Sequence, residues 1–136
     1  MKRLLLSLIF FLVLCTGCVA GLDSLTKQTQ HCQKLLWYEQ KQFNVDQIYM
    51  TVVVKRAKDM THLNAWGSVD FPPSGPVIEI MAMEDYTAGM SAKERQHQQD
   101  EVVVHEVLHV VLTREGVPMQ AQDEIIEAIR PGVRLP

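Results

Sequence analysis

The residues best suited to chemistry lie in one short stretch, His105-Glu106-Val107-Leu108-His109. Histidines four positions apart leave the same face of a helix, one turn from each other. The flanking residues are almost all Val and Leu, which predicts a buried helix. Two imidazoles and a carboxylate are costly in such a helix unless partners satisfy them. A divalent cation would do so, because neutral imidazole is a good zinc ligand, and Glu106 would lie beside a water on that cation. The alternative is a pair of core histidines hydrogen-bonded to the backbone.

A third protein ligand completes a usual catalytic zinc site, and the last predicted helix, Met119 to Arg130, offers three carboxylates. At about 100° per residue, the apolar residues of this helix spread over one broad face. Glu124 lies at the margin of that face, whereas Glu127 points away from it. Asp123 is also on the polar side, and its side chain is shorter. We therefore predict Glu124 as the third ligand, with Glu127 as the fallback; a solvated acidic face is the alternative.

The motif helix has clear end signals. Ser91 and Glu94 form a capping-box pattern, which predicts a helix start, and the helix then extends to about Arg114 before Gly116. Pro118 predicts the start of the last helix.

The elements before the motif helix predict a small α+β domain. Ser24 can cap a helix that runs to about Phe43, with an apolar stripe at helical spacing. Three strands are predicted next, at Ile48–Lys55, Ala65–Phe71 and Val77–Met83, the last two separated by a proline-rich turn. The prolines before Val77 favour an edge position for the third strand, where an extended peptide could be added.

The first residues predict export and lipid attachment. Lys2 and Arg3 precede an apolar run that is too short to span a bilayer comfortably and ends in small residues, as a secretory signal does. Leu14-Cys15-Thr16-Gly17-Cys18 resembles the lipobox of bacterial lipoproteins, which implies lipidation of Cys18. The predicted divisions are a signal peptide (1–17), a short tether (18–23) and one domain (24–136). An uncleaved anchor and an ordinary secretory peptide are the alternatives.

Composition excludes some partners. Without Lys2 and Arg3, 11 basic residues face 16 acidic ones, and no cluster of Lys and Arg indicates a nucleic-acid surface. Membrane attachment would therefore come from the lipid, at a cell envelope and facing the periplasm or exterior. After lipidation of Cys18 and removal of Cys15, Cys32 remains the single free thiol, and a buried structural role is expected for it.

His-Glu-x-x-His on a buried helix, followed by a turn and a helix that supplies a glutamate, resembles the gluzincin branch of zinc metallopeptidases. A small sheet before the motif helix is similar to the minimal single-domain gluzincins of prokaryotes and phages. The resemblance covers about Tyr49 to Arg130 and implies a zincin-like fold. It also implies that His105, His109 and Glu124 bind Zn²⁺, that Glu106 is the general base, and that the substrate is a peptide or protein. A metzincin is excluded, because no Gly-x-x-His follows His109.

Two functions from different classes follow. The first is a lipid-anchored zinc metallopeptidase, most simply an endopeptidase. The second is a non-catalytic envelope lipoprotein that zinc stabilises and that binds a partner. Glu106 discriminates between them, because a purely structural zinc site does not need that carboxylate.

Overall fold

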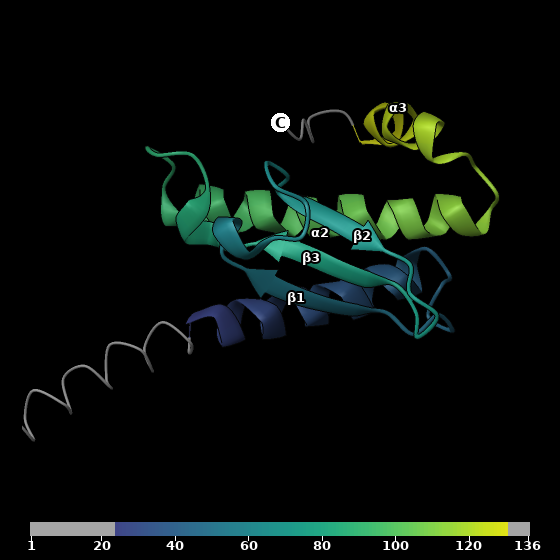
Figure 1. Cartoon of the computed structure of the whole chain (residues 1–136), viewed down its shortest axis with the longest axis horizontal. Coiled ribbons are helices and arrows are strands. Elements are labelled where there is room, and N and C mark those ends of the chain that lie inside the picture. The colour runs from purple at the N-terminus through teal and green to yellow at the C-terminus, as the bar shows by residue number, and fades with distance from the viewer. Residues whose placement is uncertain (1–23, 131–136) are drawn as a thin grey trace, which may run out of the picture.

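The computed structural model describes residues 24–130 (Figure 1). Residues 24–42 are helical and are called the N-terminal helix below. The elements that follow in chain order are β1 (Thr51–Lys55), η1 (Ala57–Asp59), β2 (Gly67–Asp70), β3 (Val77–Met81), η2 (Met83–Asp85), α2 (Ala92–Arg114) and α3 (Met119–Ile129). The predicted α+β class and the order of its longer elements are confirmed. The two single-turn 3₁₀ helices, η1 and η2, were not predicted.

The three strands form one mixed sheet in the order β1-β3-β2. β1 runs parallel to β3, with Thr51 opposite Val77, and β2 runs antiparallel to β3, with Gly67 opposite Ile80. The predicted edge position of β3 is therefore wrong. β3 is the central strand, because nearly every residue of it is buried and both its faces need cover. The edges of the sheet are β1 and β2.

Both long helices pack against the same face of the sheet (Figure 1). Alternate strand residues point to this face, as the twofold period of a strand requires. The strands and helices share one apolar core, which includes Cys32, Leu36, Val52, Val54, Ile78, Ile80, Val102, Val103 and Val107. Cys32 is buried in this core as a free thiol, as expected, and burial raises its pKa to about 12. A thiol in that state is a packing residue and a poor nucleophile.

The N-terminal helix also covers the outer edge of β1. The backbone N–H of Val54 donates to Thr29 Oγ1 at 3.0 Å, and that of Val52 donates to Gln33 Oε1 at 3.2 Å. These side chains satisfy strand donors that would otherwise face solvent. β2 is therefore the edge at which another strand could be added.

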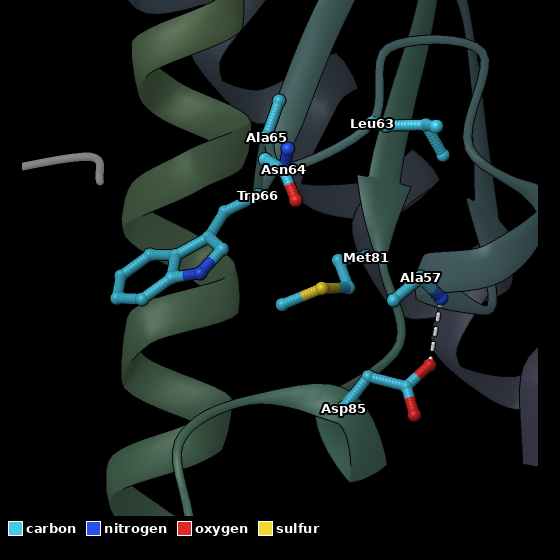
Figure 2. A pocket seen from close by; sticks show the side chains of 7 residues that line it. All are labelled: Ala57, Leu63, Asn64, Ala65, Trp66, Met81 and Asp85. Atoms are coloured by element: carbon cyan, nitrogen blue, oxygen red, sulfur yellow. Dashed lines mark hydrogen bonds between the residues drawn. The ribbon is translucent and has the colours of Figure 1, made fainter.

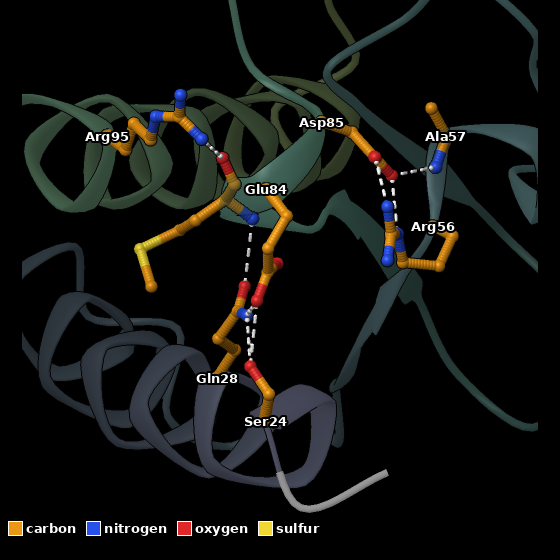
Figure 3. A network of polar contacts seen from close by, with 8 residues as sticks. Ser24, Gln28, Arg56, Ala57, Glu84, Asp85 and Arg95 are labelled. Carbon is orange, nitrogen blue, oxygen red and sulfur yellow. Dashed lines mark hydrogen bonds and ion pairs between the residues drawn. The ribbon is translucent and has the colours of Figure 1, made fainter. Parts of the chain in front are cut away.

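A polar network fastens the N-terminal helix to η2 and to the first turn of α2 (Figure 3). Gln28 accepts from the backbone N–H of Met83 at 2.9 Å and donates to Glu84 Oε2 at 3.0 Å. Arg95 of α2 donates to the carbonyl oxygen of Met83 at 3.3 Å. Gln99 reaches the same Gln28 oxygen from α2 at 2.9 Å. These bonds fix the position of α2 along its axis, relative to the N-terminal helix and η2.

A buried carboxylate on the other face of the sheet holds the loop that leads into β2. Glu79 of β3 pairs with Lys55 of β1 and accepts from both the backbone N–H and the hydroxyl of Thr61, each at 2.8 Å. Burial alone would raise the pKa of Glu79, but these donors outweigh it and lower the pKa below its ordinary value. The position of the loop, and so of the start of β2, depends on this ionised side chain.

Candidate metal centre

α2 begins at the predicted capping box. Ser91 Oγ accepts from the backbone N–H of Glu94 at 3.2 Å, and Glu94 Oε2 accepts from the backbone N–H of Ser91 at 2.6 Å. The helix ends at Arg114, and Gly116 follows with a φ of +77°, a conformation that glycine adopts without strain. Residues 102–110 are buried, so the motif lies where the helix is most enclosed.

His105 and His109 face each other one turn apart on α2. Their Nε2 atoms lie 3.1 Å apart, and the two side chains belong to residues that are only 6% and 8% exposed. Burial lowers the pKa of His105, and the neighbouring His109 lowers it further, although Asp123 opposes the shift. This shift favours the neutral form of His105, which is the form that binds a metal.

α3 brings a carboxylate to the two histidines, and it is Asp123. Its Oδ1 atom lies 3.2 Å from His109 Nε2 and 3.5 Å from His105 Nε2. Within the part of the chain that the structure describes, these three residues form the group whose ligand atoms all lie within 4.8 Å of one another. Glu124 and Glu127 are exposed and are not members of that group.

The packing of α3 explains why the structure brings in Asp123 and not Glu124. Gln122 and Ile126, one turn apart, are the buried residues of this helix, and Ile126 packs against Val104 and Leu108 of α2. The prediction placed the buried face by its apolar residues alone and left the polar Gln122 out. Because Gln122 faces α2, the next residue, Asp123, lies at the rim of the histidine pair.

The triangle of ligand atoms fits one face of a zinc tetrahedron. Bonds of about 2.0–2.2 Å in tetrahedral geometry separate two ligand atoms by about 3.3 Å. The observed separations of 3.1, 3.2 and 3.5 Å bracket this value. The Asp123 side chain is 79% exposed, so this side of the group is open to water. Two imidazole nitrogens and one carboxylate oxygen are the kinds of protein ligand that hold catalytic zinc.

Glu106 is the most enclosed charged group of the site, at 3% exposure. Burial, followed by repulsion from the carboxylate of Asp123, raises its pKa to about 8. A cation held by the neighbouring groups would act in the opposite direction and favour the carboxylate form. Perturbed carboxyl groups of this kind cluster at functional sites.

Gly67, the first residue of β2, makes room for Glu106. A Cβ atom at this position would lie 2.8 Å from Glu106 Oε1 and 2.5 Å from Val102 Cγ1. A side chain there would force these two neighbours to shift, so the glycine allows β2 to cross close to α2. The sequence analysis did not identify Gly67, although a glycine inside a predicted strand is a signal for such an approach.

His109 has a second partner that the sequence analysis also missed. Its Nδ1 atom lies 2.8 Å from Oε1 of Gln122, a residue that is only 1% exposed. By contrast, Nδ1 of His105 is buried and has no hydrogen-bond partner within residues 24–130.

A hollow of about 320 Å³ lies near the start of β2 (Figure 2). Its lining residues are Ala57, Leu63, Asn64, Ala65, Trp66, Met81 and Asp85. Asp85 is its one ionisable side chain, and this carboxylate is already paired with Arg56 and with the backbone N–H of Ala57. The hollow therefore carries no free group for chemistry, and none of the three clustered ligands belongs to it.

Comparisons of the chain with known protein families, curated proteins and solved structures found no match. Within residues 24–130, no helix is both long and apolar enough to cross a bilayer. Cys18, the predicted signal peptide (1–17) and the tether (18–23) lie outside the described residues.

Proposed function

We propose that this chain is a zinc-dependent metallopeptidase, with a gluzincin-like site on a minimal zincin-like domain. The observation that carries the proposal is the triangle of His105 Nε2, His109 Nε2 and Asp123 Oδ1, with the buried Glu106 near enough to Asp123 for the two carboxyl groups to repel each other. The sequence motif alone predicts two of these ligands. The proposal is further supported by a carboxylate oxygen that α3 places 3.2 and 3.5 Å from the two imidazole nitrogens, close to the spacing of ligands around zinc.

His105, His109 and Asp123 would hold the ion, with Asp123 taking the place that the sequence analysis gave to Glu124. Zinc bound there would lower the pKa of a water molecule toward neutrality and polarise the carbonyl group of a peptide bond. Because the Asp123 side chain is 79% exposed, water would reach the ion from its side.

Glu106 would serve as the general base and then as the general acid. Its carboxylate accepts a proton from the attacking water, and its carboxylic acid returns that proton to the leaving nitrogen. Burial raises the pKa of Glu106 in the metal-free chain, and a cation at the neighbouring groups would favour the carboxylate form that the first step needs. Gly67 keeps the opposite wall of the site free of a side chain, so Glu106 is not displaced.

β2 is the edge on which we propose that an extended peptide docks, in place of β3. Met81 donates its backbone N–H to the carbonyl oxygen of Trp66 at 2.8 Å, which makes this a hydrogen-bonded antiparallel pair. By the alternation of such a ladder, the N–H and C=O groups of Gly67 and Val69 point away from β3. Gly67 is buried and Val69 is half-buried, so Val69 offers the more accessible pair of groups.

Proline at position 69 tests the docking edge. Val69→Pro removes the outward N–H and fixes φ, but it takes no donor from the bonds between β2 and β3. Val69→Ala is the control, because it loses the same side-chain packing and keeps the donor. We expect a higher KM for peptides in Val69→Pro than in Val69→Ala. Equal KM values in two folded variants would remove β2 from the proposal.

The proposed location is a cell envelope, where lipid on Cys18 would anchor the chain on the periplasmic or exterior side. The proposal is supported by the lipobox-like sequence Leu14–Cys18 and by the apolar run before it. Mass spectrometry of the chain recovered from membranes tests it: a lipid-modified N-terminal Cys18 is expected, and Cys18→Ser should abolish the modification.

The decisive test of function is Glu106→Gln in the full chain, assayed on casein and on a randomised peptide mixture. The replacement is nearly the same size and cannot accept the proton, so we expect a loss of about 10²–10⁴-fold in kcat with zinc content retained. Glu115→Gln, an exposed carboxylate at the end of α2, is the control. Full hydrolysis by Glu106→Gln would refute the mechanism. Stoichiometric zinc without hydrolysis in the unmodified chain would favour the zinc-stabilised binding module.

A further inference from the structure

Gln122 is a buried amide whose oxygen and nitrogen are both in use. Its Nε2 atom donates to the carbonyl oxygen of Val117 at 2.8 Å and to Thr113 Oγ1 at 3.1 Å. Its Oε1 atom faces His109 Nδ1 at 2.8 Å. The side chain therefore connects the turn between α2 and α3 to the ring of a proposed ligand.

The chemistry of these partners fixes the direction of every bond. The carbonyl oxygen of Val117 can only accept, so the NH₂ end of Gln122 must face it. The amide oxygen then faces His109, and because that oxygen also can only accept, Nδ1 of His109 must carry a proton. In a neutral imidazole the other nitrogen, Nε2, then keeps its lone pair. Asp123 Oδ1 competes for the proton from the Nε2 side, but at 3.2 Å it lies farther from the ring than the Gln122 oxygen at 2.8 Å.

We propose that Gln122 is a positioning residue, which locks His109 in the Nδ1–H tautomer and presents Nε2 to the metal. The statement about metal rests on the proposed zinc site, whereas the statement about the tautomer does not. Partners of this kind orient ligand histidines in many metal sites, and their loss typically weakens metal binding by about 10–100-fold.

The two histidines differ in this respect. Nδ1 of His105 has no partner within the described residues, so no bond at that atom selects its tautomer; its Nε2 atom instead faces His109 Nε2 at 3.1 Å and Asp123 Oδ1 at 3.5 Å. Of the two histidines, His109 is thus the one whose Nδ1 atom is held by a side-chain partner, Gln122. The lock itself is anchored in the turn, since the backbone N–H of Val117 donates to the carbonyl oxygen of Leu112 at 2.9 Å. A change in the conformation of the turn would therefore move the Gln122 amide, and with it the ring of His109.

Three variants of the full chain, solubilised in detergent, distinguish a hydrogen-bonding role of Gln122 from a role in packing alone. Gln122→Met keeps the length of the side chain and removes both polar atoms. Gln122→Glu keeps an acceptor oxygen for His109. Gln120→Met makes the same exchange at an exposed position two residues earlier in α3, and it serves as the control.

Two measurements read the result. Long-range ¹H–¹⁵N NMR of the metal-free protein at about pH 8, above the usual range of histidine titration, reports the tautomer of His109 directly. Competition with a chromophoric chelator reports the zinc affinity. We expect the Nδ1–H tautomer in the unmodified chain, in Gln120→Met and in Gln122→Glu. Gln122→Met should lose that preference and bind zinc about 10–100-fold more weakly.

Two outcomes would overturn the inference. One is an unmodified chain in which His109 carries its proton on Nε2. Another is a folded Gln122→Met, judged by circular dichroism, that keeps both the tautomer and the affinity. If the unmodified chain binds no zinc, the proposed function fails, and the NMR comparison still decides whether Gln122 sets the tautomer.

Discussion

The close crossing of β2 over α2 makes Gly67→Ala a sharp test of the site's geometry. The added Cβ would lie 2.5 Å from Val102 Cγ1 and 2.8 Å from Glu106 Oε1, both well inside ordinary contact distance. Val102 is fully buried and Glu106 is 3% exposed, so neither can swing aside into solvent. Overpacking of this kind costs about 1–3 kcal/mol of the free energy of unfolding. Equilibrium unfolding in urea measures it.

A double-mutant cycle identifies the cause of that loss. Val102→Ala alone removes two buried methyl groups and should cost about 2–3 kcal/mol. The same change gives room to the new methyl group in Gly67→Ala, so the double variant should be about 1–2 kcal/mol more stable than the sum of the two single effects. Glu106 still meets the new methyl group, so hydrolysis should not recover with stability.

The control and the refutation use the neighbouring strand position. Ser68 points to the other face of the sheet, and its buried hydroxyl has no partner within residues 24–130. Ser68→Ala should therefore be neutral or slightly stabilising. A Gly67→Ala variant as stable as the unmodified chain, or strictly additive losses in the cycle, would show that β2 does not approach α2 as closely as described.

Three further predictions concern the metal and the fold. Asp123→Ala should lower zinc content, measured by atomic emission, whereas Glu124→Ala should not; the reverse result would restore the original choice of ligand. Removing zinc with a chelator should lower the thermal midpoint, because zinc at about a hundred times its Kd adds about 2.7 kcal/mol of stability. Glu79→Gln should cost about 1–3 kcal/mol at neutral pH. Because the pKa of Glu79 is lower in the folded chain, its contribution to stability is present above the unfolded pKa and disappears as the pH falls through the folded pKa. The loss of stability in Glu79→Gln should therefore become smaller in acid. Urea unfolding midpoints from about pH 7 down to pH 3 would show this.

The parts of the fold that short-range chemistry determines could be predicted from the sequence. The capping box at Ser91 and the glycine at Gly116 set the limits of α2, and the alternation around Val69 indicated a strand. The order of strands could not be predicted, because pairing depends on which faces other elements cover. The N-terminal helix takes the edge of β1, which leaves β3 in the centre.

The carboxylate that lies nearest the two histidines was not predicted, for a similar reason. The rotation of α3 about its own axis was predicted from hydrophobicity, but the buried face includes Gln122. Its amide is buried because it satisfies polar groups of α2 and of the turn, which no periodicity reports. The spacing does give one signal that the prediction did not use: Gln122 lies four residues before Ile126 and therefore on the same face of the helix.

Two residues that do not share a partner thus position the groups of the site, one on β2 and one on α3. Gly67 of β2 leaves room for the Glu106 side chain, and Gln122 of α3 holds His109 by a hydrogen bond. Effects at sites that share no partner should combine independently. We therefore expect Gly67→Ala to impair hydrolysis at unchanged zinc affinity, and Gln122→Met to weaken zinc to the same extent with or without Gly67→Ala. Competition titrations of the two single variants and the double variant test this. A double variant that binds zinc much more weakly than Gln122→Met would mean that β2 also positions the ligands, and that metal and base are set by one element.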